Sequence, residues 1–207
     1  MNITVRGIQF GEREVRDLLL AWLALGLAFT FFIGLPRPVQ TATNLSFVAL
    51  ARVFALSIVT VGTGFLLHEI AHKVVAIRFG QVAAFRANYG MLGIAIASGL
   101  AGFLFAAPGA VYHRGRITDR QNGLVAVAGP VTNLGLAVLF LPLYFGPGIV
   151  GDIGRWGLLV NVFLAAFNMI PFGPLDGNTV LSWSVSVFAL VLGTSLVVSL
   201  GLFLYVL

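Results

Sequence analysis

The chain has 207 residues, of which 59% are hydrophobic and only 9% are charged. With a mean hydropathy of +1.01, it has too few charges to cover the surface of a water-soluble domain of this size. The composition excludes an ordinary soluble protein and predicts a single integral membrane domain over residues 1–207, with the lipid bilayer as partner. The twelve Lys and Arg give a net charge of +5 but are scattered, which argues against nucleic acid as a partner.

Apolar runs of about 20 residues, the length that a membrane-spanning helix requires, follow one another along the chain. The first extends from about residue 18 to 35 and ends before Pro36 and Pro38, which stop a helix. Three further runs occupy about 53–79, 124–145 and 156–170, and the tail at 180–207 fits one long helix or two short ones. We therefore predict an all-α, polytopic bundle of about five to six transmembrane spans.

Residues 88–112 are apolar but rich in glycine, so a full span, a re-entrant loop or a pair of short strands would each fit. Positively charged residues favour the cytoplasmic side of a membrane. If the basic N-terminal segment is inside, the second span ends inside near Arg78, and the basic loop at 114–120 belongs on the same side. Arg78 and the loop at 114–120 can lie on the same side only if the segment between them enters the membrane and returns. We therefore favour a re-entrant or β-hairpin segment near 88–112. We expect a multi-pass protein of the cell membrane with its N-terminus in the cytoplasm.

The second apolar run is interrupted by His68, Glu69 and His72. Four residues apart on a helix, the two imidazoles project from one face and can share a tetrahedral zinc ion, while Glu69 can take a proton from water beside it. Each ionisable side chain at the centre of a membrane helix costs on the order of 2.5–3.5 kcal/mol, so the cluster needs a partner such as a divalent cation. We predict one Zn²⁺ per chain, and iron or cobalt would suit the same ligands.

A catalytic zinc usually has three protein ligands, so a third donor is needed. Of the seven acidic residues, Glu69 is already assigned and five others lie before the first span or in connecting loops, so only Asp176 remains, at the end of an apolar segment. Pro171 and Pro174 prevent a regular helix just before it, and irregular backbone at membrane depth is tolerated only inside protein or beside a cavity. We predict Asp176 as the third ligand, with the alternative that it only caps the next helix.

Taken together, these residues resemble the site-2 protease family of intramembrane zinc metalloproteases, in a minimal form. The resemblance lies in H-E-I-A-H at 68–72, N-M-I-P-F-G-P-L-D-G at 168–177 and G-P-V-T-N at 129–133. It covers roughly residues 50–180, which we expect to be the catalytic core. It implies that the two histidines and Asp176 bind zinc and that Glu69 is the catalytic base. By the same resemblance Asn133 and Asn168 would line the site and bind substrate, although polar packing between helices would also explain them.

We therefore expect a zinc metalloendopeptidase that hydrolyses peptide bonds within or near transmembrane helices of membrane protein substrates, as in regulated intramembrane proteolysis. Its active site would lie towards the cytoplasmic side, and an extended stretch of substrate could pair with an edge in the 88–112 segment. Two alternatives are an inactive scaffold that binds transmembrane helices and a metal transporter. The transporter has less support, because transporters commonly contain internal repeats and this sequence shows none.

Overall fold

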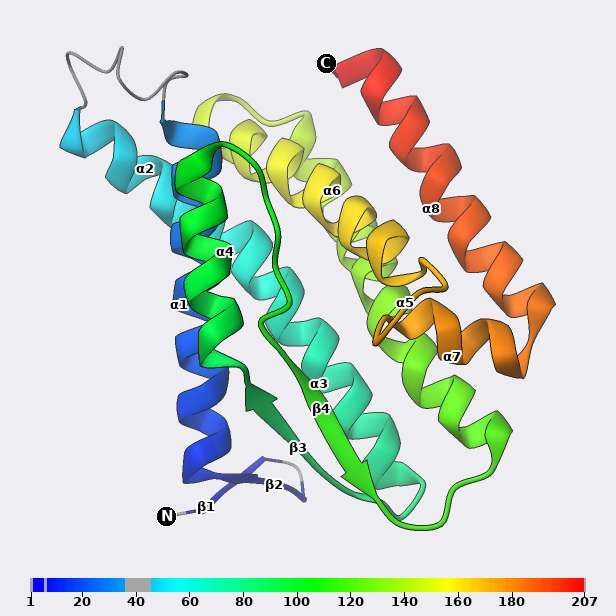
Figure 1. Ribbon diagram of the computed structural model, residues 1–207. Coiled ribbons are helices and arrows are strands. Elements are labelled where there is room, and N and C mark those ends of the chain that lie inside the picture. The colour runs from blue at the N-terminus through cyan, green and yellow to red at the C-terminus, as the bar shows by residue number, and fades with distance from the viewer. Residues whose placement is uncertain (1, 6, 36–45, 207) are drawn as a thin grey trace. The chain divides into compact units, whose positions relative to one another are not determined.

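A computed structural model of the chain describes residues 2–5, 7–35 and 46–206 (Figure 1). Five helices in this part of the chain are long and apolar enough to cross a membrane, which confirms the predicted all-α polytopic bundle. The shortest has 20 residues and so measures about 30 Å, the thickness of the hydrocarbon core. The proline pair expected to end the first span lies outside the described residues. The five candidate spans are Glu12–Gly34, Phe47–Arg78, Asp119–Tyr144, Gly148–Asn168 and Val185–Leu204.

The chain divides into two compact units, one of Met1–Thr63 and Phe85–Ala110, the other of Gly64–Ala84 and Val111–Leu207. That the whole chain acts as one metalloprotease domain stays a prediction. The elements of the first unit are β1 (Asn2–Val5), β2 (Ile8–Gly11), α1 (Glu12–Gly34), α2 (Phe47–Ser57), the π-helical turn η2 (Ile58–Gly62) and α4 (Tyr89–Ala101).

In the first unit, β1 and β2 form an antiparallel hairpin in which Ile3 lies opposite Phe10. Helix α1 follows and packs against α2 and α4. The contact with α4 depends on Gly99, because a Cβ there would lie 2.3 Å from the carbonyl oxygen of Ala28. Small residues of this kind allow helices in a membrane to approach closely.

The second span contains a π-helical turn, η2, between α2 and α3 (Thr63–Arg78). The indole N–H of Trp22 on α1 donates to the carbonyl of Ile58 at 3.1 Å, which also accepts from the backbone and hydroxyl of Thr63, so this bond ties α1 to the turn. Gly62 makes room for the indole, because a Cβ there would lie 2.2 Å from the ring. Turns of this kind are frequent at functional sites, and here one immediately precedes the helix that carries His68.

The predicted re-entrant or β-hairpin segment near 88–112 contains α4 and most of β4 (Gly109–Arg114), and β3 (Val82–Ala87) directly precedes it. The two strands pair and run in opposite directions (Figure 1). Helix α4 has 13 residues and is about 20 Å long, too short to cross the hydrocarbon core. It ends at Gly102, whose φ of 90° is left-handed and suits glycine. Because β3 and β4 pair, the chain after α4 returns beside the strand that precedes it. A short helix, α4, occupies most of the segment that was predicted to be re-entrant or a β-hairpin.

Two buried carboxylates of α1 bind the backbone of β3. Glu14 accepts a hydrogen bond from the Phe85 N–H at 3.1 Å, and Asp17 accepts one from the Ala87 N–H at 3.3 Å. Asp17 also accepts one from the hydroxyl of Tyr89. Because these carboxylates satisfy backbone donors on a short strand, they fix β3 against the first helix.

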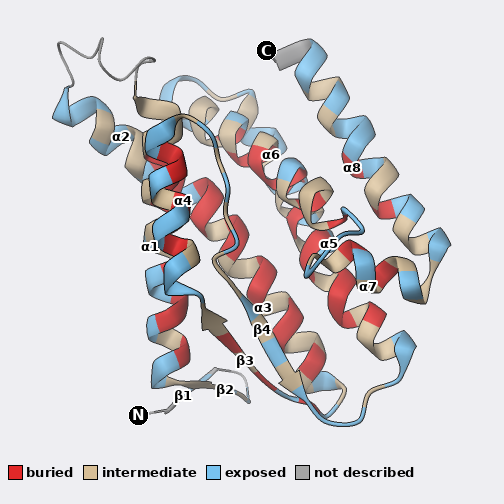
Figure 2. Cartoon of the chain, in the orientation of Figure 1, coloured by how far each residue is buried: buried red, intermediate tan, exposed pale blue. Residues whose placement is uncertain are grey.

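The second unit consists mainly of helices, and it contains every residue predicted for the site. Helix α5 begins with a capping box, in which Thr118 and Gln121 bond reciprocally through side chain and backbone. The short α7 is separated from α8 by Ser184, so the tail forms two helices. Figure 2 shows buried stretches along α3 and α5. The helices of this unit are α3, α5 (Asp119–Tyr144), α6 (Gly148–Asn168), α7 (Asp176–Trp183) and α8 (Val185–Val206).

Candidate metal centre

Helix α3 carries His68, Glu69 and His72 into the interior of the second unit. Their exposed fractions are 5%, 8% and 7%. The imidazole rings, one helical turn apart, meet edge to face with centroids 4.6 Å apart. The structure thus places two potential metal ligands on one face of a buried helix, as their spacing predicted.

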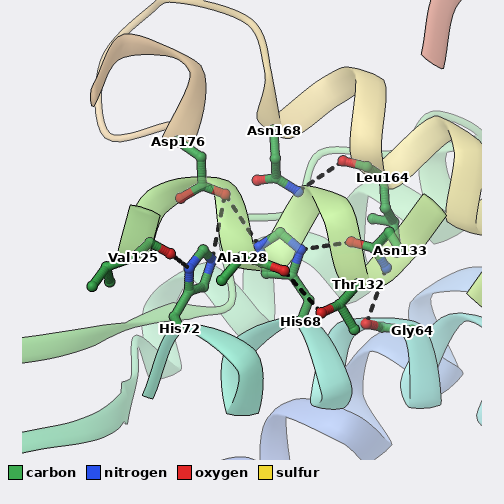
Figure 3. Close-up of polar contacts among 10 residues, drawn as sticks. All are labelled: Gly64, His68, His72, Val125, Ala128, Thr132, Asn133, Leu164, Asn168 and Asp176. Carbon is green, nitrogen blue, oxygen red and sulfur yellow. Dashed lines mark hydrogen bonds and ion pairs between the residues drawn. The ribbon is translucent and has the colours of Figure 1, made fainter. Parts of the chain in front are cut away.

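Asp176 reaches the same place from the start of α7. Its Oδ2 lies 3.3 Å from Nε2 of His68 and 3.4 Å from Nε2 of His72 (Figure 3). The next residue, Gly177, lets α7 begin directly against the end of α6, because a Cβ there would lie 2.1 Å from the carbonyl oxygen of Met169. The N-cap of α7 is Leu175 and receives no side-chain cap bond, so Asp176 does not act as the cap.

The three side chains fit a zinc ion. Donors about 2.0–2.2 Å from a tetrahedral zinc lie about 3.3–3.5 Å from one another, and the two distances to Asp176 fall in this range. All three ligand atoms lie within 4.8 Å of one another. Among the described residues, Oδ2 of Asp176 and Oε2 of Glu69 are buried without a hydrogen-bond partner. Because buried polar atoms are nearly always paired, an unpartnered oxygen of Asp176 between two imidazoles fits a site that holds a metal ion.

A main-chain carbonyl orients the second histidine. Nδ1 of His72 lies 2.7 Å from the carbonyl oxygen of Val125 on α5. Because a carbonyl can only accept, Nδ1 is the donor, so in the neutral imidazole the lone pair is on Nε2, where a metal can bind. Histidine ligands of metals usually have such a partner on the other ring nitrogen.

The first histidine is oriented by a side chain. Nδ1 of His68 lies 2.6 Å from Oδ1 of Asn133, whose own exposed fraction is 0%. The amide nitrogen of Asn133 donates to the carbonyl of Gly64 and to the side chain of Asn161. With its amide committed in this way, Asn133 supports the ligand from behind, and a contact of Asn133 with substrate stays a prediction.

Asn168 lies beside Asp176 at the end of α6 (Figure 3). Its amide nitrogen donates to the carbonyl of Leu164, one turn earlier in the same helix, at 2.9 Å. Unlike Asn133, it forms no hydrogen bond with either histidine among the described residues. The structure therefore brings Asn168 next to the site, and its predicted role in substrate binding stays open.

Gly129, to which the sequence motifs gave no role, lies against the Nε2 atoms of both imidazole rings. A Cβ at this position would lie 2.4 Å from Nε2 of His72 and 2.5 Å from Nε2 of His68. Only glycine lets α5 pass so close to the two nitrogens. Pro130 follows inside the helix and cannot donate a backbone hydrogen bond. A glycine and a proline together within an apolar helix were the available signal.

Glu69 lies next to strand β4. The backbone of Val111 hydrogen-bonds the Glu69 carboxylate, and the two histidines and Asp176 are close enough for their charges to act on it. The carboxylate therefore has one oxygen held by the strand and the other, Oε2, without a partner among the described residues. This arrangement suits a base that exchanges a proton with water.

Comparison with known proteins finds relatives with a shared designation. "Putative zinc metalloprotease MJ0611" of Methanocaldococcus jannaschii is 39% identical over 188 residues, which cover 88% of this chain and 91% of the relative. "Putative zinc metalloprotease YwhC" of Bacillus subtilis is 30% identical over 60% of this chain and 66% of its own length. "Putative zinc metalloprotease Rip3" of Mycobacterium tuberculosis is 32% identical over 55% of this chain and 26% of its own length. No family model and no solved structure matches the chain.

Proposed function

Because this chain belongs to the site-2 protease family of membrane zinc metalloproteases, we propose that it hydrolyses peptide bonds within or near transmembrane helices of other membrane proteins. The cleavage would serve regulated intramembrane proteolysis. The observation that carries the proposal is the convergence of three metal-binding donors, beside a buried carboxylate, in a protein with five candidate membrane spans.

In this proposal His68, His72 and Asp176 hold one zinc ion. The chemistry that zinc supplies when bound is Lewis-acid polarisation of the scissile carbonyl and activation of water. As the oxygen of the water bonds to the scissile carbon, Glu69 takes a proton from that water. Oε2 of Glu69 is the available acceptor. When the carbon–nitrogen bond breaks, Glu69 returns the proton to the leaving amine.

The depth of the site supports a substrate within the membrane. His68 is ten residues before Arg78, at the end of α3, and so lies about 15 Å along the helix from that end. This is half of a hydrocarbon core of about 30 Å. A substrate helix must unwind there before its carbonyls can be attacked, and an extended stretch would lie along β4, whose Val111 contacts the base.

The order of the helices supports an active site on the cytoplasmic side of the cell membrane. If α3 ends inside and the segment from β3 to β4 returns to the same side, then α5 leads outward and α6 leads back. Asp176 follows α6, so it would lie on the side where α3 ends. Arg78, at the end of α3, favours the cytoplasm for that side.

The test is Glu69→Gln in purified protein in lipid nanodiscs, with a tagged single-span membrane protein as substrate. We expect one zinc per chain in both proteins and a cleavage rate at least about 100-fold lower in the variant, the usual contribution of a general base. If the protein is an inactive scaffold, the wild type will not cleave the substrate either. Wild-type protein that binds no zinc, or a variant that cleaves at the wild-type rate, would refute the proposal.

A further inference from the structure

A third asparagine, Asn161 on α6, is completely buried behind the candidate metal centre. It belongs to none of the three sequence patterns at 68–72, 129–133 and 168–177. Its side chain touches α3 so closely that a Cβ on Gly64 would lie 2.7 Å from its Oδ1. Burying an amide in an apolar bundle costs free energy unless its hydrogen bonds are made, so its partners show what the residue does.

The partners of Asn161 form a chain of hydrogen bonds that leads to a metal ligand. The amide nitrogen donates to the carbonyl of Gly157 at 2.8 Å, one turn back in α6. Its Oδ1 accepts from the amide nitrogen of Asn133 at 2.9 Å. Oδ1 of Asn133 then faces Nδ1 of His68 at 2.6 Å (Figure 3).

The donor and acceptor of each bond in this series are determined by its first hydrogen bond. A main-chain carbonyl can only accept, so Gly157 requires the amide nitrogen of Asn161 and turns Oδ1 towards Asn133. Asn133 must then present its nitrogen to Asn161, as it also does to the carbonyl of Gly64. Its oxygen is left for His68, whose Nδ1 must therefore be the donor, so that in the neutral imidazole the lone pair is on Nε2.

We propose that Asn161 is a positioning residue for the metal centre: acting through Asn133, it holds His68 in the ring orientation and tautomer that a zinc ion requires. This inference rests on the proposed function for its consequence, although the hydrogen bonds themselves need no metal. Since Gly64 supplies Asn133 with a second acceptor, loss of Asn161 weakens this support and does not abolish it. We expect zinc affinity to fall about tenfold, the lower end of the range for outer partners of metal ligands.

The role of Asn161 can be separated from simple packing, because the two histidines have different anchors. His72 is held by the carbonyl of Val125 and has no part in the chain from Asn161. A positioning role predicts a change at His68 alone, whereas a loosened bundle would disturb both rings. The protein has three histidines. With the third replaced, as His113→Gln, only the signals of His68 and His72 remain in the spectrum.

The experiment uses the full chain in lipid bilayers with ¹⁵N-labelled histidine. Asn161→Leu keeps the volume and removes the hydrogen bonds, and Asn161→Asp restores an acceptor for Asn133. Ser195→Ala is the matched control, because Ser195 is also completely buried and its hydroxyl donates to the carbonyl of Val191 in its own helix. Solid-state NMR reports the Nδ1–H signal of His68, and competition with a chromogenic chelator reports zinc affinity.

We expect Asn161→Leu to shift or broaden the His68 signal, leave His72 unchanged and lower zinc affinity about tenfold, with recovery in Asn161→Asp. An unchanged His68 signal and affinity, or equal changes at both histidines, would overturn the inference. If Asn161→Leu does not fold, Asn161→Ser is used, which keeps the bond within α6 but is too short to reach Asn133. Because the His68 signal is also read without zinc, wild-type protein that binds no zinc refutes the proposed function and leaves this inference testable.

Discussion

Substitution of Gly129 by alanine tests the architecture of the metal centre most directly. The new methyl group would lie 2.4 Å from Nε2 of His72 and 2.5 Å from Nε2 of His68. Comfortable contact between such atoms requires about 3.5 Å, so the two rings would have to move by about 1 Å. Neither ring is free to swing aside, because each is bonded through Nδ1 to a group behind it.

A displacement of this size is incompatible with zinc binding by all three ligands. Metal–ligand distances hold to within about 0.2 Å, so at least one imidazole would leave the coordination sphere. We expect zinc affinity to fall at least 100-fold, or about 2.8 kcal/mol. Loss of a group that only hydrogen-bonds a metal ligand lowers affinity about 10–100-fold. The loss expected here lies at or above the top of that range, because an imidazole itself would be displaced.

The assay is chelator competition on purified protein, together with thermal unfolding and cleavage of a tagged membrane substrate. Gly135→Ala is the matched control, because it lies in the same helix and a Cβ there would meet nothing within 4 Å. The control should bind zinc normally and be equally or slightly more stable, since alanine favours a helix by up to about 1 kcal/mol over glycine. Normal zinc affinity and cleavage in Gly129→Ala would show that the donors do not converge as described.

Three further predictions concern the other parts of the molecule. Gly62→Ala should lower the unfolding temperature, because its Cβ would lie 2.2 Å from the Trp22 ring. The control Gly93→Ala, whose Cβ would meet nothing within 4 Å, should not lower it. Equal unfolding temperatures of the two variants would contradict the packing of Trp22 against the π-helical turn. Asp176→Asn should lower zinc affinity at least tenfold by removing a negative ligand, and chelator competition giving the wild-type value would exclude Asp176 as a ligand. Asn168→Ala should leave zinc affinity unchanged, since the hydrogen bond of its amide stays within α6, and a raised KM for cleavage would support a role in substrate binding.

The sequence predicted the bundle and the convergence of His68, His72 and Asp176 because the cost of charge in lipid is so large. Three ionisable side chains in one apolar run require a partner, and elimination among seven acidic residues left Asp176. The geometry agrees, with donors 3.3 and 3.4 Å apart. Here a strong energetic constraint acted on few candidates.

Features that depend on backbone contacts between distant segments were not predictable in the same way. Nothing in the sequence marks Val125 as the acceptor for His72, since a main-chain carbonyl belongs to every residue. Nothing in the sequence marks Glu14 and Asp17, at the start of the first span, as buried residues, yet both are buried and bind the backbone of β3. Asn161 stands outside the recognised patterns, and only its neighbours in space show its connection to His68.

The two imidazoles differ in a way that affects how the site can change. His72 is oriented by a carbonyl of the main chain, which no substitution at position 125 removes. His68 is oriented by the side chain of Asn133, supported in turn by Asn161, and both can be replaced by a single mutation. Variation in metal affinity among engineered forms of this chain should therefore arise on the His68 side, while substitutions at Val125 that preserve packing should leave the His72 anchor intact.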